Sequence, residues 1–147
     1  ITNVPGLVLS TFYADCVPLY FVDPVHCAIG LSHSGWRGTV NRMGKATIEA
    51  MRREYGSRPE ELRCAIGPSI CQDCYEVSGD VAMEFEQTFA GHEREILLAK
   101  ENGKYQLDLW KANEIVLLDA GVLPEHLEIT DICTCCNPDL LFSHRAR

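Results

Sequence analysis

The strongest constraint on the fold is a change of hydrophobic period between residues 17 and 55. Two apolar runs, Val17–Val22 and His26–Ser32, lie on either side of an Asp23–Pro24 turn and predict two strands joined as a hairpin. Residues Thr39–Tyr55 then place their apolar side chains at helical spacing, and Gly56 supplies a stop signal. We therefore expect a sheet that contains a hairpin and carries a helix.

Similar patterns predict a mixture of strands and helices in the rest of the chain. Helices are expected at Ser78–Phe89 and at Leu109–Ala120, where Asp108 is a suitable cap. Further strands are expected at Leu7–Tyr13, Leu62–Gly67, Tyr105–Leu107, Leu127–Ile132 and Leu140–Ser143. This mixture favours the α/β (α+β) class, with mixed β-sheets.

Length and charge narrow the class of protein. The 147 residues fit a single domain, residues 1–147, and because the chain starts at Ile1 we expect a partial domain that lacks N-terminal and C-terminal segments of a longer protein. Thirteen basic residues against 21 acidic ones give a net charge of −8, and the basic residues are scattered, so we expect no nucleic-acid partner. No apolar run approaches the roughly eighteen residues of a membrane span, so we expect no membrane partner.

The cysteines indicate a reducing environment. The chain has 8 cysteines in 147 residues, about 5%, which is below the density of a disulfide-stapled scaffold. Cys27 and Cys64 lie inside apolar runs, where a reduced cysteine behaves as a small hydrophobic residue. We therefore expect a cytoplasmic protein.

Two candidate metal ligands stand near the ends of the predicted hairpin. Cys16 closes the segment A-D-C, and His33 opens the segment H-S-G-W-R-G. A thiolate and an imidazole are both zinc ligands, and a catalytic zinc site uses three protein ligands and one open position. The spacing alone leaves open a buried cysteine and a loop histidine with no metal. His26 is expected at the opposite end of its strand from His33 and is a poor third ligand.

The turn that follows His33 is a candidate anion-binding site. Gly35 and Gly38 allow a sharp turn and a close approach of the backbone to a ligand. Arg37 can grip a phosphate or a carboxylate with two hydrogen bonds. The alternative is a tight turn between a strand and a helix, in which Arg37 pairs with a surface acid.

Three other polar residues are candidates for the same site. Asp15 can orient a metal ligand or act as a base, and the alternative is a solvated or turn-capping aspartate. His144 and Arg145 can contact an anion, and the alternative is a solvated pair near the C-terminus.

The remaining cysteines suggest a second kind of metal site. Cys71 and Cys74 are followed, after 58 intervening residues, by Cys133, Cys135 and Cys136. This separation is far from the spacing of zinc ribbons, and Cys71–Cys74 lacks the helix-opening context of a thioredoxin motif. The spacing therefore disfavours a structural zinc site or a redox site.

Seven segments in order resemble a known family over nearly the whole chain: A-D-C-V-P-L, H-S-G-W-R-G-T, A-I-G-P-S-I, C-Y-E-V, L-D-L-W-K-A-N, I-C-T and F-S-H-R-A. They are similar to those of the laccase-domain family, whose legacy name is polyphenol oxidase and whose members are described as purine nucleoside phosphorylases with adenosine deaminase activity. The resemblance implies a four-layer α/β/β/α fold. It also implies zinc held by a cysteine, which falls on Cys16, and by two histidines, of which one falls on His33 and the other precedes this chain.

The resemblance implies a transferase that phosphorolyses adenosine, inosine and S-methyl-5'-thioadenosine, with a hydrolase activity on adenosine. The partners would be purine nucleosides and inorganic phosphate. On this hypothesis the catalytic residues are Cys16, His33, Asp15 and Arg37, and the phosphate-binding residues are Gly35, Arg37, Gly38, His144 and Arg145.

Three alternatives remain open. One is a copper-dependent oxidoreductase that acts on phenols, although five scattered histidines do not supply the clusters of a multicopper site. A second is a cysteine hydrolase in which His33 activates Cys16. The third is a non-enzymatic zinc or thiol module built on the other cysteines.

Overall fold

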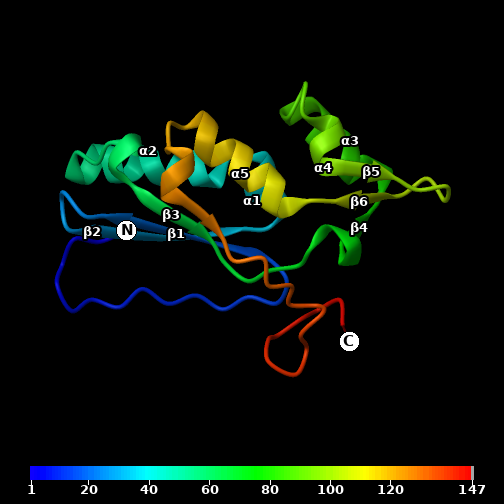
Figure 1. Ribbon diagram of the computed structural model, residues 1–147, viewed down its shortest axis with the longest axis horizontal. Coiled ribbons are helices and arrows are strands. Elements are labelled where there is room, and N and C mark those ends of the chain that lie inside the picture. The colour runs from blue at the N-terminus through cyan, green and yellow to red at the C-terminus, as the bar shows by residue number, and fades with distance from the viewer. Residues whose placement is uncertain (147) are drawn as a thin grey trace.

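The computed structural model describes residues 1–146, which form two sheets with helices packed against them (Figure 1). The larger sheet has the strand order β2-β1-β3-β7, in which β1 is antiparallel to β2 and to β3, while β3 and β7 are parallel. These strands span Val17–Asp23 (β1), Ala28–Ser34 (β2), Arg63–Ile66 (β3) and Leu127–Ile129 (β7). The expected mixed sheet with helices is confirmed.

The predicted hairpin is also confirmed. The pairing of β1 with β2 runs from Val17 opposite Ser34 to Asp23 opposite Ala28. The carboxylate of Asp23 closes the turn, because it accepts hydrogen bonds from the backbone N–H groups of Val25 and His26 at 2.9 and 3.0 Å. Strand β2 runs two residues further than expected, so His33 lies in the strand rather than after it.

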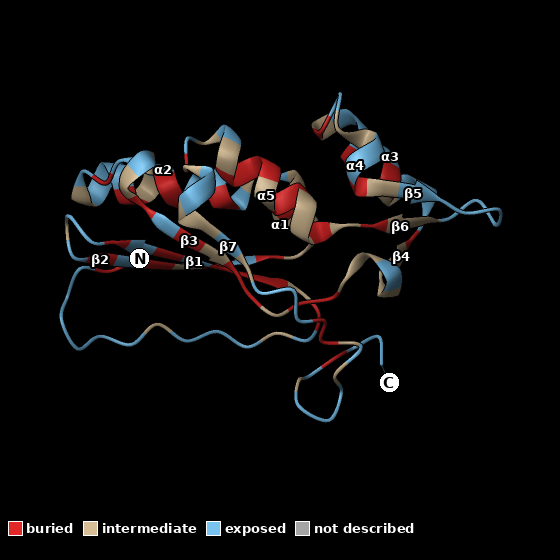
Figure 2. Ribbon diagram, in the orientation of Figure 1, coloured by how far each residue is buried: buried red, intermediate tan, exposed pale blue. Residues whose placement is uncertain are grey.

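Helices α1 (Trp36–Val40), α2 (Met43–Tyr55) and α5 (Leu109–Asp119) cover one face of the larger sheet (Figure 1). Figure 2 shows that the buried residues of the strands and of these helices meet between the two layers. The core there is built from large apolar side chains, among them Leu19, Phe21, Ile48, Met51 and Leu117. The predicted helix at Leu109–Ala120 is confirmed, and the carboxylate of Asp108 accepts a hydrogen bond from the backbone N–H of Lys111, 2.9 Å away.

The single helix expected at Thr39–Tyr55 is wrong, because the chain forms two helices there. Arg42 has a φ of 53°, in the left-handed region, and this interrupts the helix between α1 and α2. The amide of Asn41 donates to the carbonyl of Arg37 at 2.8 Å, so a side chain takes an acceptor at the end of α1. Such local competition with the backbone is not visible in the hydrophobic period.

The smaller sheet has the order β4-β6-β5 and is antiparallel throughout. Its strands are Glu76–Val77 (β4), Leu97–Ala99 (β5) and Tyr105–Leu107 (β6), and it lies beside α3 (Gly79–Thr88) and α4 (Glu93–Ile96). The predictions of β6 and α3 are confirmed. Strands β4 and β5 and helix α4, of two to four residues each, were not predicted from the sequence.

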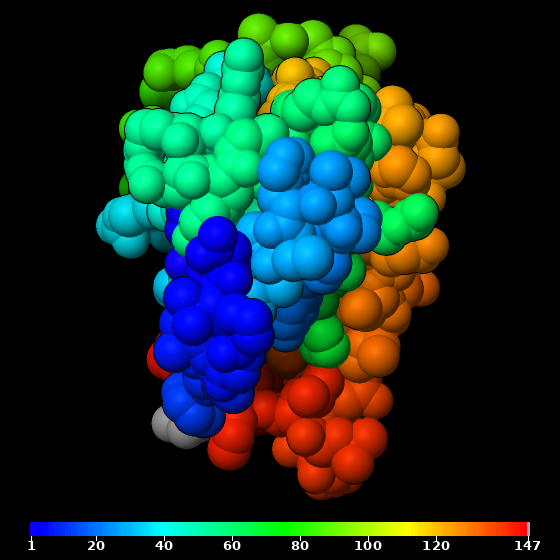
Figure 3. All heavy atoms as spheres, turned by 90° about the vertical axis from the view of Figure 1, so that its left-hand side faces the viewer, coloured from blue at the N-terminus to red at the C-terminus, as the bar shows by residue number. Residues whose placement is uncertain are grey.

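Two expected strands, Leu7–Tyr13 and Leu140–Ser143, are wrong. Residues 7–13 run as an extended segment without sheet pairing, and residues 140–143 lie in a loop near the C-terminus. Their apolar side chains are exposed, Phe12 to 91% and Leu140 to 84%, so these short apolar runs do not mark a buried face. Figure 3 shows both segments at the surface, and they share a pocket lined by Thr11, Phe12, Leu141 and Phe142 among others.

Three short 3₁₀ helices complete the description: η1 (Pro59–Glu61), η2 (Gln72–Cys74) and η3 (Pro124–His126). Among residues 1–146, none of the helices has both the length and the apolar character needed to cross a lipid bilayer.

Candidate functional site

The hairpin brings Cys16 and His33 to the same end of the larger sheet. Cys16 directly precedes β1, and because Pro18 pairs with His33 the two candidate ligands are neighbours across the ladder. Both line one cavity of about 360 Å³, together with Gly35, Arg37 and others. A Cβ built on Gly35 would lie 2.9 Å from Sγ of Cys16 and 3.5 Å from Nε2 of His33, so both donor atoms face this glycine.

This arrangement fits a zinc ion with two of its protein ligands. The missing side chain at Gly35 leaves open space next to one sulfur and one nitrogen donor, which are both zinc ligands. The ring of Tyr13 packs against that of His33, with 4.8 Å between the ring centroids. His26 does not belong to the group, because its Nδ1 is bonded to Asp23 at the far end of the hairpin.

Asp15 is a buried anchor for the C-terminal loop. One carboxylate oxygen accepts a hydrogen bond from Oγ1 of Thr134 at 2.7 Å, and the other accepts from the backbone N–H groups of His144 and Arg145, each at 2.8 Å. Burial acts to raise the pKa of Asp15, but these bonds and one from Ser143 lower it overall. Both carboxylate oxygens of Asp15, next to Cys16, are thus engaged by the C-terminal loop.

A buried polar network holds the glycine-bracketed turn. Asn113 of α5 accepts a hydrogen bond from Oγ of Ser34 at 2.8 Å and donates one to Oγ1 of Thr39 at 3.0 Å. Thr39 in turn donates to the carbonyl of Gly35 at 3.0 Å. All three polar side chains of the network are fully buried. These residues were missed from the sequence, where Asn113 appears only as part of the segment L-D-L-W-K-A-N.

Arg37 presents its guanidinium at this turn. Its Cζ lies 4.2 Å from the centroid of the Trp36 ring, and within residues 1–146 no carboxylate forms an ion pair with it. The alternative of an arginine paired with a surface acid is therefore not what the described chain shows. At Gly38, within α1, a Cβ would lie 3.1 Å from the carbonyl oxygen of His33, a tight contact that a larger residue would have to relieve.

Tyr75 is a second residue that the sequence analysis did not single out. The guanidinium of Arg145 lies 5.2 Å from the centroid of its ring. Burial raises the pKa of Tyr75, and the charges of Arg145, Cys16, Asp15 and Arg37 all act on it as well. The phenol is thus a protonated group among the candidate site residues. His144, in contrast, has an exposed side chain, and its described contact is the backbone bond to Asp15.

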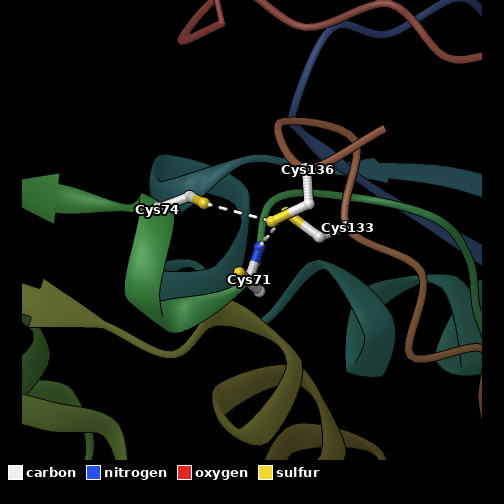
Figure 4. Close-up of side chains that lie close together, drawn as sticks. All are labelled: Cys71, Cys74, Cys133 and Cys136. Carbon is white, nitrogen blue, oxygen red and sulfur yellow. Dashed lines mark hydrogen bonds between the residues drawn. The ribbon is translucent and has the colours of Figure 1, made fainter. Parts of the chain in front are cut away.

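Four of the other cysteines come together despite their separation in sequence. The sulfurs of Cys71, Cys74, Cys133 and Cys136 all lie within 4.8 Å of one another (Figure 4). Burial acts to raise the pKa of Cys133, but hydrogen bonds from the backbone N–H groups of Cys71 and Cys136 lower it to about 7. The spacing argument against a second metal site fails here, because tertiary contacts and not chain distance place these thiols.

Comparison with known proteins gives a consistent picture. Residues 1–147 match the family model described as multi-copper polyphenol oxidoreductase laccase. The chain is 37% identical over 146 residues to the purine nucleoside phosphorylase YlmD of Bacillus subtilis (strain 168), covering 98% of this chain and 51% of that protein. It is also 37% identical over 145 residues to the adenosine deaminase RL5 of an unknown prokaryotic organism, covering 99% and 55%.

Solved structures agree with this likeness. The crystal structure of YlmD from Geobacillus stearothermophilus superposes with a TM-score of 0.84 at 37% identity, over 90% of this chain and 49% of that one. A hypothetical protein YfiH of Bacillus licheniformis gives a TM-score of 0.85 at 36% identity, over 90% and 50%. The chain thus spans about half the length of the relatives that it matches.

Proposed function

Because the chain belongs to the multi-copper polyphenol oxidoreductase laccase family, we propose that it forms part of a zinc-dependent purine nucleoside phosphorylase. The substrates would be adenosine, inosine and S-methyl-5'-thioadenosine, with deamination of adenosine as a second activity. Relatives named purine nucleoside phosphorylase and adenosine deaminase support an enzyme of this kind. The observation that carries the proposal is the pair Cys16 and His33, whose donor atoms face one cavity beside Arg37.

The metal would be held by Cys16, by His33 and by a third ligand from outside this chain. When bound, zinc supplies a Lewis acid and lowers the pKa of a coordinated water. The donor set of one thiolate with imidazole nitrogens is a zinc set. Copper is supported only by the family's description. The side chains of His26 and His92 are hydrogen-bonded to Asp23 and Glu95 and do not lie beside His33 as ligands of a copper cluster would.

The residues around the cavity would bind phosphate. Arg37, held against Trp36, can form two parallel hydrogen bonds to a phosphate oxygen pair. Gly35 and Gly38 let the anion approach the backbone of the turn, which the Ser34–Thr39–Asn113 network keeps rigid. Arg145, which lies against the protonated phenol of Tyr75, would add a second positive charge, and the phenol a hydrogen-bond donor.

Cys16 suits a ligand better than a free nucleophile. Burial raises the pKa of its thiol, and the negative charge of Asp15 raises it further. The raised pKa keeps the thiol protonated as a free nucleophile, which disfavours the alternative of a cysteine hydrolase. Asp15 uses both carboxylate oxygens to hold the C-terminal loop, so its contribution is to fix Cys16 in place.

We also propose a reducing, cytoplasmic setting. All eight cysteines of the chain are free of disulfides in the structure, and several of them are grouped as metal ligands would be.

The test uses the full-length protein that contains this chain. Zinc content and phosphate-dependent release of hypoxanthine from inosine are measured for the wild type, Cys16→Ala and His33→Ala. We expect both substitutions to abolish base release and to remove the zinc bound at this site. Cys27→Ala, at an exposed turn cysteine, is the matched control and keeps both properties. Full activity in either ligand variant would contradict the proposal.

A further inference from the structure

We propose that Cys71, Cys74, Cys133 and Cys136 form a second metal site, a zinc tetrathiolate that fastens the C-terminal loop to the segment after β3. This site is separate from the Cys16–His33 pair and has a structural role. It does not depend on the proposed function, because it needs no substrate and no catalytic step.

The distances between the sulfurs suit tetrahedral zinc. With Zn–S bonds of about 2.3 Å, neighbouring sulfurs of a tetrahedron are about 3.8 Å apart. All four Sγ atoms lie within 4.8 Å of one another, and those of Cys74 and Cys136 are 3.5 Å apart. Figure 4 shows the four side chains converging from two separate segments, with Cys74 and Cys136 pointing toward one another. Small shifts of side chains would complete the geometry.

Each segment presents its two cysteines in the same way. Cys71 and Cys74 bracket the single turn η2, and Cys133 and Cys136 bracket a turn in the loop after β7. Two residues separate the ligands in both cases, which is the shortest of the usual spacings in structural zinc sites. The pattern is therefore two matched ligand turns that the fold brings face to face.

Backbone contacts hold the two turns together without any metal. Ser69 donates its N–H to the carbonyl of Ile132 and accepts from the N–H of Thr134, both at 3.1 Å. Its side chain is fixed in turn, because Trp110 donates to Oγ of Ser69 at 2.6 Å. The N–H of Cys71 also donates to the sulfur of Cys133 at 3.3 Å, a type of bond that stabilises a coordinating thiolate. The site is thus preformed.

Zinc binding at this site needs no oxidant. Four thiols take up one Zn²⁺ and release four protons, which leaves four Zn–S bonds and a net charge of −2 on the site. Formation of a disulfide between Cys74 and Cys136 would instead require an external oxidant and would leave no ligand set. The two possibilities therefore give opposite results for bound metal and for free thiols.

The site would also support the candidate catalytic site. Thr134, between two of the ligands, donates to the carboxylate of Asp15, the residue before Cys16. Loss of the second metal would therefore loosen Asp15. This consequence for activity rests on the proposed function, whereas the metal site itself does not.

Zinc is measured per chain by elemental analysis in the full-length protein, purified under reducing conditions. We expect Cys74→Ser combined with Cys136→Ser to lose one zinc that Cys16→Ser retains. Cys135→Ser lies in the same turn but outside the group of four, and Cys27→Ser is distant, so both controls keep the full zinc content. An unchanged zinc content in the double variant overturns the proposal.

A second measurement does not rely on the folding of the double variant. The Cys16→Ser protein is stripped of metal and titrated with cobalt(II). We expect one equivalent to give the intense thiolate-to-cobalt charge-transfer absorption and the visible bands of a tetrahedral tetrathiolate. The absence of this spectrum would overturn the second site. So would a Cys74–Cys136 disulfide found by mass spectrometry in protein kept reduced. Neither result decides the Cys16–His33 proposal, which has its own test.

Discussion

The space between the two candidate ligands of the first site depends on one glycine. A side chain at Gly35 would put its Cβ 2.9 Å from the sulfur of Cys16, closer than such atoms normally approach. Cys16, His33 and Gly35 therefore act as a unit, although only the first two carry donor atoms. The segment H-S-G-W-R-G is informative because it keeps the glycine at a fixed distance from the histidine.

Gly35→Ala should weaken zinc binding without removing a ligand. The new methyl group displaces the sulfur or the imidazole, and a disturbed ligand position typically lowers metal affinity about 10- to 100-fold. The zinc dissociation constant is measured by competition with a chelator. Gly79→Ala is the control, because its Cβ would meet nothing closer than 3.9 Å. Equal affinities for the two variants would show that the cavity is not the metal's place.

Asp15 should make the protein's stability depend on acid. Its pKa is lowered in the folded state, against burial, by hydrogen bonds from Ser143, Thr134 and two backbone N–H groups. The unfolded chain therefore binds this proton more readily. The stabilisation is fully present above the ordinary pKa of 3.8 and is lost as the pH falls through the lower folded value.

Asp15→Asn should cost about 1–3 kcal/mol of unfolding free energy at neutral pH, as for a charged group that loses buried hydrogen bonds. It should also flatten the loss of stability in acid. Denaturation followed from neutral pH to below pH 3.8 measures both effects. Asp139→Asn, at an exposed position of the same loop, is the control. If the stability of Asp15→Asn fell at low pH as the wild type's does, the anchoring role of Asp15 would be contradicted.

Helix α5 packs against the glycine-bracketed segment where β2 leads into α1 and holds it in place. Asn113 is the contact, since its amide bonds to Ser34 and to Thr39 and also donates to the carbonyl of Leu109 at 2.8 Å. The position of Arg37 thus depends on a helix that starts more than 70 residues later. Gly44 allows this packing, because a Cβ there would lie 2.9 Å from Leu117 of α5.

Asn113→Ala should destabilise the protein and weaken phosphate binding more than nucleoside binding. It removes the buried hydrogen bonds that Asn113 makes with Ser34 and Thr39, at a cost of about 1–3 kcal/mol in unfolding free energy. Chemical denaturation gives the stability, and KM for phosphate and for inosine gives the effect on the turn. The control is Asp119→Asn, also in α5, which removes only an exposed ion pair with Arg42. It should change the free energy of unfolding by about 1 kcal/mol or less. An equal rise of both KM values would argue against a phosphate-specific turn.

In the whole molecule, segments from both ends of the chain meet around the candidate site. Asp15 and Cys16 come from the N-terminal part, and residues 133–145 come from the C-terminal loop (Figure 1). This loop has no regular secondary structure, and its order rests on Asp15, on Ser69 and on the four-cysteine group. Metal binding at the four-cysteine group is therefore expected to add to the backbone contacts that already order the loop.

Hydrogen exchange of the full-length protein tests this dependence. In the Cys74→Ser and Cys136→Ser double variant, the amides of Thr134, His144 and Arg145 should exchange about tenfold faster or more, which corresponds to about 1.4 kcal/mol of local stability. The amides of the β1–β2 hairpin serve as the internal reference and should be unchanged. Unchanged protection of the loop would mean that Asp15 and Ser69 suffice to order it.

Local patterns predicted those elements that are long enough to show a period. The hairpin, α3 and α5 were predicted because their apolar side chains repeat over several turns or strand positions. The two expected strands outside the sheets failed, because a short apolar run such as Leu7–Tyr13 does not reveal whether a neighbouring strand is present. The single helix expected at Thr39–Tyr55 failed because its break depends on one left-handed residue, Arg42.

The sequence by itself determined the mixed α and β class, the hairpin and the segments around Cys16 and His33 that indicate the family. Each of these is encoded within a short stretch, where side-chain period and motif spacing act directly. Only the tertiary structure decided that Asp15 anchors the C-terminal loop and that four distant cysteines meet. The physical reason is that sheet pairing and buried hydrogen bonds join residues such as Ser69 and Thr134 regardless of the chain between them.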